Sequence, residues 1–121
     1  MLAEIKGAEN AEEFETDERC HIVEIANDSS DTRLSIARAR VEPGVTTAWH
    51  HLNGIDERYL IISGQGRVEL GEQEACEVMP GDVVRIPAGV AQRISNTGEE
   101  QLIFYALCTP RFDVHAYVSL E

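Results

Sequence analysis

The stretch PGVTTAWHHLNGIDERYLIISG, from Pro43 to Gly64, decides the fold. Two adjacent histidines, His50 and His51, stand near its middle, and Glu57 follows them within the same stretch. Alternate side chains of a strand share one face, so two neighbouring histidines cannot both face one cavity from a regular strand. Only a bulge would bring both to the same side. The stretch therefore predicts one inward and one outward histidine.

The same alternation predicts how the second half of this stretch is oriented. Glu57, Tyr59 and Ile61 should lie on one face of a strand, and the residues between them on the other. His50 and His51 take opposite faces by the same rule. For the runs 34–41 and 102–108, both faces are plausible as the inward face.

Short strand-like runs separated by turn signals fill most of the chain. Asn53-Gly54 and Pro80-Gly81 are typical of these turns. The predicted strands span residues 20–26, 34–41, 46–52, 58–63, 66–70, 75–79, 82–87, 91–96 and 102–108. This pattern predicts an all-β sandwich or barrel with little helix.

Composition limits the size and the partners of the protein. The chain has 121 residues, 43% of them hydrophobic, which is enough for one core and too little for two ordinary domains. Its net charge of −12 repels phosphate backbones and anionic lipid, so we expect neither nucleic acid nor a membrane as a partner. Without a signal-like or membrane-length apolar run, a cytoplasmic protein is expected. The three widely spaced cysteines suggest reduced thiols.

The spacing of glycine, proline and polar residues resembles the two motifs of the cupins. The first motif matches at Gly44, His50, Glu57 and Gly64, and the second at Gly81, Pro87, Gly89 and Asn96. The resemblance covers about residues 33–108 and implies a cupin-type double-stranded β-helix, a jelly-roll barrel. We expect an acidic N-terminal arm over 1–19, the barrel over 20–110, and a tail over 111–121 that packs on the barrel or on a partner subunit. By analogy with small cupins, a homodimer is expected.

The resemblance also implies a metal site, and this sequence departs from it. Cupins usually supply His-x-His and a glutamate from the first motif and a further histidine from the second. His50 and Glu57 match, whereas Leu52 and Gln92 stand at the other two positions. A carboxamide is a weak donor and leucine is none, so the expected ligands are His50, Glu57 and Gln92, with His51 as an alternative if the strand bulges. They would hold one divalent ion (Fe, Mn, Ni or Zn) weakly, or none.

Three functions stay open at this point. In the first, an enzyme binds a small organic molecule in the barrel, with a weakly held metal and dioxygenase, lyase or isomerase chemistry. Without metal, Glu57 would act as a base, His50 as an acid or oxyanion donor, and Tyr59 would hold the substrate. The second is a non-catalytic module that binds or senses a small molecule without metal. In the third, Gln92 simply satisfies Glu57 or His50 in a structural polar cluster.

Overall fold

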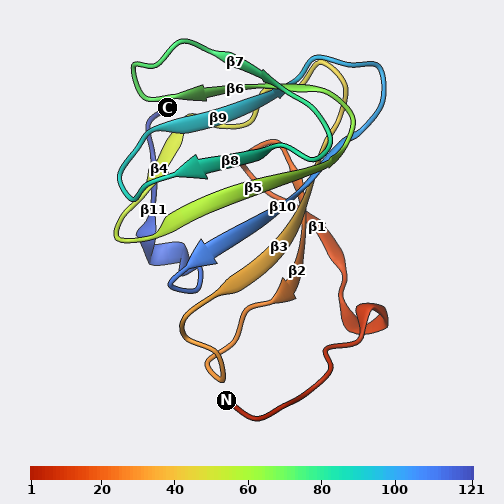
Figure 1. The fold of residues 1–121 in the computed structure, drawn as a ribbon, viewed down its shortest axis with the longest axis vertical. Coiled ribbons are helices and arrows are strands. Elements are labelled where there is room, and N and C mark those ends of the chain that lie inside the picture. Colours follow the sequence, from red (N-terminus) through yellow and green to blue (C-terminus); the bar gives the residue numbers. More distant parts are fainter.

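The computed structural model describes residues 1–121 as two antiparallel sheets that face each other (Figure 1). The strands are β1 (Glu13–Glu15), β2 (His21–Ala26), β3 (Ser35–Val41), β4 (His50–Leu52), β5 (Asp56–Ser63), β6 (Gly66–Leu70), β7 (Cys76–Val78), β8 (Val83–Ile86), β9 (Gln92–Asn96), β10 (Leu102–Thr109) and β11 (Tyr117–Ser119). Two short 3-10 turns, η1 (Ala8–Asn10) and η2 (Val114–Ala116), are the only helical segments. No helix has the length and apolar character needed to cross a membrane.

The strand order within the two sheets is that of a jelly roll. One sheet has the order β1-β2-β3-β10-β5-β8 and the other the order β11-β4-β9-β6-β7. Neighbours in a sheet are mostly far apart in the sequence, because the chain alternates between the two sheets. The all-β, cupin-type double-stranded β-helix predicted from the sequence is confirmed.

The inward face of each central strand is set by burial of its apolar positions. In β10, Leu102, Phe104, Ala106 and Cys108 are buried, while the residues between them are half-buried on the outside. This settles the orientation of β10, where the sequence left both faces open. Burying alternate apolar side chains on one face removes them from water and drives the two sheets together.

Strand β5 carries a carboxylate into this interior. Glu57, Tyr59 and Ile61 are all buried, as the alternation predicted, and Glu57 lies opposite Cys108 of β10 and Ile86 of β8. The central position of β5 between these two strands fixes the direction of each side chain. A carboxyl group is thus held at a place where the pattern would otherwise put an apolar residue.

Strand β4 is shorter than predicted but has the predicted register. Only the last three residues of the run 46–52 form the strand, and Thr46 makes an isolated bridge to Ser95 before it. His50 is buried and pairs with Gln92 of β9, whereas His51 is half-buried and pairs with Val118 of β11. No bulge brings the two histidines to one face.

Segments flanking the barrel complete the two sheets. Strand β1 pairs with β2, and β11 pairs with β4 of the same chain. Neither strand was predicted, because Glu13–Glu15 is mostly acidic and Tyr117–Ser119 is very short. Between β1 and β2, the backbone carbonyl of Glu18 accepts a hydrogen bond from the amide of Ala48, just before β4 (3.0 Å). The segment after β1 is thereby fixed beside the histidine strand.

Candidate functional site

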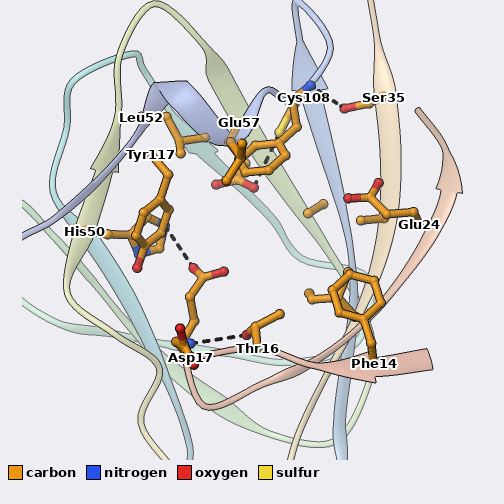
Figure 2. A pocket seen from close by; sticks show the side chains of 16 residues that line it. Phe14, Thr16, Asp17, Glu24, Ser35, His50, Leu52, Glu57, Cys108 and Tyr117 are labelled. Carbon is orange, nitrogen blue, oxygen red and sulfur yellow. Dashed lines mark hydrogen bonds and ion pairs between the residues drawn. The ribbon is translucent and has the colours of Figure 1, made fainter. Parts of the chain in front are cut away.

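A cavity of about 430 Å³ lies between the two sheets (Figure 2). The six-stranded sheet contributes Glu24, Glu57 and Cys108, and the five-stranded sheet contributes His50 and Tyr117. In Figure 2, His50 and Tyr117 lie side by side on one wall, and Glu24 lies across the cavity from them. Aliphatic and aromatic side chains make up most of the remaining wall. A volume of this size is typical of small-molecule sites.

His50 presents one ring nitrogen to the cavity in a fixed tautomer. Its Nδ1 lies 2.8 Å from the carbonyl oxygen of Ala48, which can only accept, so Nδ1 carries a proton. Nε2 therefore faces the cavity, where the carboxylate of Glu18 lies 3.7 Å away. The ring also stacks on Tyr117, with centroids 4.8 Å apart. These contacts orient the imidazole for proton transfer at Nε2.

Glu57 is a buried carboxyl group with one free oxygen. Its side chain is 9% exposed, and its Oε2 accepts a hydrogen bond from the Cys108 thiol (3.5 Å), while Oε1 has no partner. Burial raises the pKa of Glu57 to about 7, against the smaller opposing effects of Gln92 and Cys108. Near neutral pH this group can therefore give or take a proton.

The cavity has an acidic lining without a lysine or arginine to balance it. Asp17, Glu18, Glu24 and Glu57 line it, and no lysine or arginine does. Burial raises the pKa of Glu18, and nearby His50 partly lowers it again. An anionic ligand would meet repulsion and lose its hydration without a cationic partner.

Tyr59 and Gln92 lie behind the cavity rather than in its wall. The Tyr59 hydroxyl donates to Oε1 of Gln92, and both residues are buried. The Tyr59 ring packs against Phe104, with centroids 4.4 Å apart. Burial raises the pKa of Tyr59 well above its ordinary value, so the hydroxyl stays protonated as a donor. The two residues form a polar pair that supports the inner end of the site.

The donor set does not fit a cupin metal. His50 and Glu57 reach the cavity, but Leu52 offers no donor and the Gln92 oxygen is already bound to Tyr59. His51 points away from the cavity, where its Nδ1 is buried without a partner. No three His, Cys, Asp or Glu side chains are placed to hold an ion together. The side chains at this site therefore do not make up the usual metal-ligand set of a cupin.

The sequence did not identify Glu18 and Tyr117 as residues of the cavity. Glu18 belongs to an acidic segment that showed no clear pattern, and Tyr117 belongs to a tail whose partner strand was unknown. Only the pairing of β11 with β4 and the contact of Glu18 with Ala48 bring them to His50. Such long-range contacts leave no local signal in the sequence.

The fold is similar to several solved structures. A Streptomyces Pac13 variant with uridine has a TM-score of 0.83 at 17% identity, covering 100% of this chain and 93% of that one. A further Pac13 structure, described as a unique nucleoside dehydratase, has a TM-score of 0.82 at 17% identity, covering 99% and 92%. Staphylococcus aureus CapF, a capsular polysaccharide assembling protein, has a TM-score of 0.75 at 23% identity, with 92% of this chain and 34% of that one covered. At these identities the likeness concerns the fold alone.

Sequence comparisons identify the family. A vicilin-like seed storage protein of Arabidopsis thaliana is 36% identical over 62 residues, which is 49% of this chain and only 13% of that protein. Residues 37–109, more than half of the chain, match the family model described as a cupin domain. They include both motifs from His50 to Asn96. The chain therefore belongs to the cupin family.

Proposed function

We propose that this cupin is an enzyme that moves protons on a small uncharged organic molecule without a metal. The observation that carries the proposal is the pairing in one cavity wall of Glu57, whose buried Oε1 has no hydrogen-bond partner, with His50, whose Nδ1 is held by Ala48 so that Nε2 is left for a ligand. A carboxyl group and an imidazole in one cavity are groups that general acid-base catalysis uses.

The charge of the cavity limits the substrate class. Four carboxyl groups without a lysine or arginine disfavour phosphates and carboxylates as ligands, whereas uncharged hydroxyl groups can donate hydrogen bonds to the carboxyl groups that line the cavity. Tyr117, Phe14 and Phe112 offer ring faces for a flat apolar moiety. A nucleoside-like molecule combines these properties. The fold likeness to Pac13, solved with uridine and described as a nucleoside dehydratase, supports this choice of class.

The reaction that fits these groups is dehydration of a hydroxylated carbonyl compound, or the related isomerisation. Glu57 removes a proton from the carbon next to the carbonyl group, and the electron pair of that C–H bond forms a new C=C bond. The C–O bond to the hydroxyl on the adjacent carbon breaks, and the oxygen takes a proton from Nε2 of His50 in its doubly protonated form and leaves as water, so that His50 ends with its proton on Nδ1 alone. Both protons and the hydroxyl group are accounted for, and no oxidant is needed. Before this step, the nearby carboxylate of Glu18 stabilises the proton on Nε2 by charge attraction.

Ligand class is tested first by binding. Uridine and uridine 5′-monophosphate are titrated into isotope-labelled protein, and shifts of the Leu52 and Ala106 methyl signals in the cavity wall are followed by NMR. We expect saturable shifts with uridine and at least about tenfold weaker binding of the monophosphate, whose charge faces the acidic lining. Equal or tighter binding of the monophosphate would overturn the proposed class.

Catalysis is tested by exchange with solvent. Nucleoside 5′-aldehydes and related hydroxy-ketones are incubated with the protein in deuterated water, and deuterium uptake and loss of water are measured by mass spectrometry. We expect uptake or dehydration with the wild type, and a loss of roughly a hundredfold or more in Glu57→Gln and in His50→Gln. Binding of uridine without exchange or turnover of any such compound would favour the alternative, a non-catalytic binding module.

A further inference from the structure

Glu18 reaches His50 from a tight turn between β1 and β2. In this turn the amide of Glu18 donates to Oγ1 of Thr16 (3.2 Å), and the amide of Arg19 donates to the Thr16 carbonyl (3.2 Å). Arg19 has a φ of 68°, a left-handed conformation that a non-glycine residue adopts only at a cost. Something outside the turn must hold Arg19 in this conformation.

The side chain of Arg19 supplies that restraint. Its Nη1 and Nη2 bind the two carboxylate oxygens of Glu121 (3.0 and 2.8 Å), and its Nε donates to the carbonyl of Thr46 (2.8 Å). Glu121 Oε2 also accepts from the amide of Trp49 (2.8 Å), and the amide of Leu120 donates to the Trp49 carbonyl (2.9 Å). The Arg19–Glu121 pair therefore ties the turn to the residue that directly precedes His50.

The electrostatics of the pair agree with this geometry. The bidentate contact with Arg19, with help from the Trp49 amide, lowers the pKa of Glu121 to about 2. Glu121 is therefore ionised over the whole physiological pH range, and its ion pair with Arg19 is charged throughout that range. A bidentate arginine-carboxylate contact also fixes direction as well as distance.

We propose that Glu18 is a further residue of the active site and that Arg19 and Glu121 are positioning residues that hold its carboxylate beside His50. The inference rests on the proposed function for the chemical role of Glu18, since that role is to support a proton on Nε2. The positioning itself does not depend on any substrate. Glu121 acts from outside the cavity, which it does not line.

The first test measures the turn in the ligand-free protein. Hydrogen exchange of the Ala48 amide, which donates to the Glu18 carbonyl, is followed by NMR in the wild type, Arg19→Ala, Glu121→Ala and the double variant. We expect exchange to be roughly two- to fivefold faster than in the wild type in each single variant, which corresponds to the free energy of an exposed ion pair. The double variant should exchange no faster than the single variants, because each of them already removes the pair. Unchanged exchange in Glu121→Ala would overturn the proposal.

Glu69→Ala is the matched control. Glu69 also makes a bidentate contact with an arginine, Arg93, whose guanidinium lies over the Trp49 ring, but neither residue hydrogen-bonds to the turn or to Glu121. This variant should leave the exchange of Ala48 at the wild-type rate. An equal acceleration in the control would show general loosening of the sheet and would also contradict the positioning role.

The second test reads the carboxylate of Glu18 directly. Because burial is the main cause of its raised pKa, release of the turn into solvent should lower that pKa toward the ordinary 4.5 in Glu121→Ala but not in Glu69→Ala. Carboxyl carbon NMR over a pH series measures it. A Glu18 titration identical to that of the wild type would refute the positioning role. Neither test uses a ligand, so failure of uridine to bind would not affect them.

Discussion

At the scale of single residues, burial of Glu57 is the feature with the largest chemical consequence. A carboxyl group with one free oxygen in an apolar wall holds its proton more tightly than the same group in the unfolded chain. The folded state therefore binds more protons than the unfolded state between pH 4.5 and about 7, and its stability falls as the pH rises through that window.

Replacement of Glu57 by glutamine should remove this pH dependence. The contribution is fully present below pH 4.5 and is lost above about pH 7, so Glu57→Gln is expected to be more stable than the wild type at pH 8 by about 3 kcal/mol at most. Urea unfolding at pH 4.5 and at pH 8 measures the difference. A variant whose stability relative to the wild type is the same at both pH values would show that Glu57 is solvated.

Tyr59 offers a second prediction at this scale. In Tyr59→Phe the ring still packs on Phe104, but Gln92 loses the donor to its buried oxygen, so we expect a loss of about 1–3 kcal/mol in unfolding free energy. Uridine affinity should be unchanged, because Tyr59 does not line the cavity. Weaker uridine binding with unaltered stability would instead place this hydroxyl at the ligand.

At the scale of elements, the turn after β5 takes the chain from the sheet that carries Glu57 to β6 in the other sheet. Gly64 has a φ of 88°, and a Cβ placed there would lie 2.6 Å from the carbonyl oxygen of Gln101. Gly44 has a similar φ of 80° but open space around it. A side chain at Gly44 would meet only the cost of a left-handed backbone, whereas a side chain at Gly64 would also collide with neighbouring atoms.

We expect Gly64→Ala to destabilise the protein by more than about 2 kcal/mol and Gly44→Ala by about 1 kcal/mol. Only the first substitution adds a collision with the backbone before β10 to the cost of the left-handed conformation. Chemical unfolding of both variants measures the two values. Equal losses would mean that the backbone near Gln101 moves aside freely.

The elements also show what the sequence could and could not predict. Alternation in β5 predicted that Glu57, Tyr59 and Ile61 share a face, and the resemblance to the cupin motifs predicted the fold and the inward direction of Glu57 and His50. The cavity wall formed by Glu18 and Tyr117 depends on pairing between distant segments, which periodicity does not report. The catalytic roles and the homodimer stay predictions.

At the scale of the whole molecule, the acidic character of the chain continues into the cavity. The net charge of −12 and a cavity lining without lysine or arginine both disfavour anionic ligands. The His50 and Glu57 positions of the cupin motif are kept, while the positions of the other two ligands have become an apolar wall residue, Leu52, and a buried partner of Tyr59, Gln92. The barrel thus keeps two of the four usual ligand positions and fills the other two with side chains that do not reach the cavity as free donors.

Removal of metal should therefore leave the protein unchanged. Protein prepared without a histidine tag is dialysed against a chelator and then supplied with Fe(II), Mn(II), Ni(II) or Zn(II). Because His50 and Glu57 alone provide too few ligands, we expect the same melting temperature and the same uridine affinity in every sample. Stoichiometric metal with a higher melting temperature would restore the metal-dependent alternative.

The titration of Glu57 tests the central claim most directly, because acid-base chemistry in this cavity requires a carboxyl group that exchanges its proton near neutral pH. Carboxyl carbon NMR of the ligand-free protein, with Glu57→Gln to assign the signal, measures its pKa. The structure predicts a midpoint at about 7. A midpoint at the ordinary value of 4.5 would leave Glu57 ionised at neutral pH and contradict the proposed function.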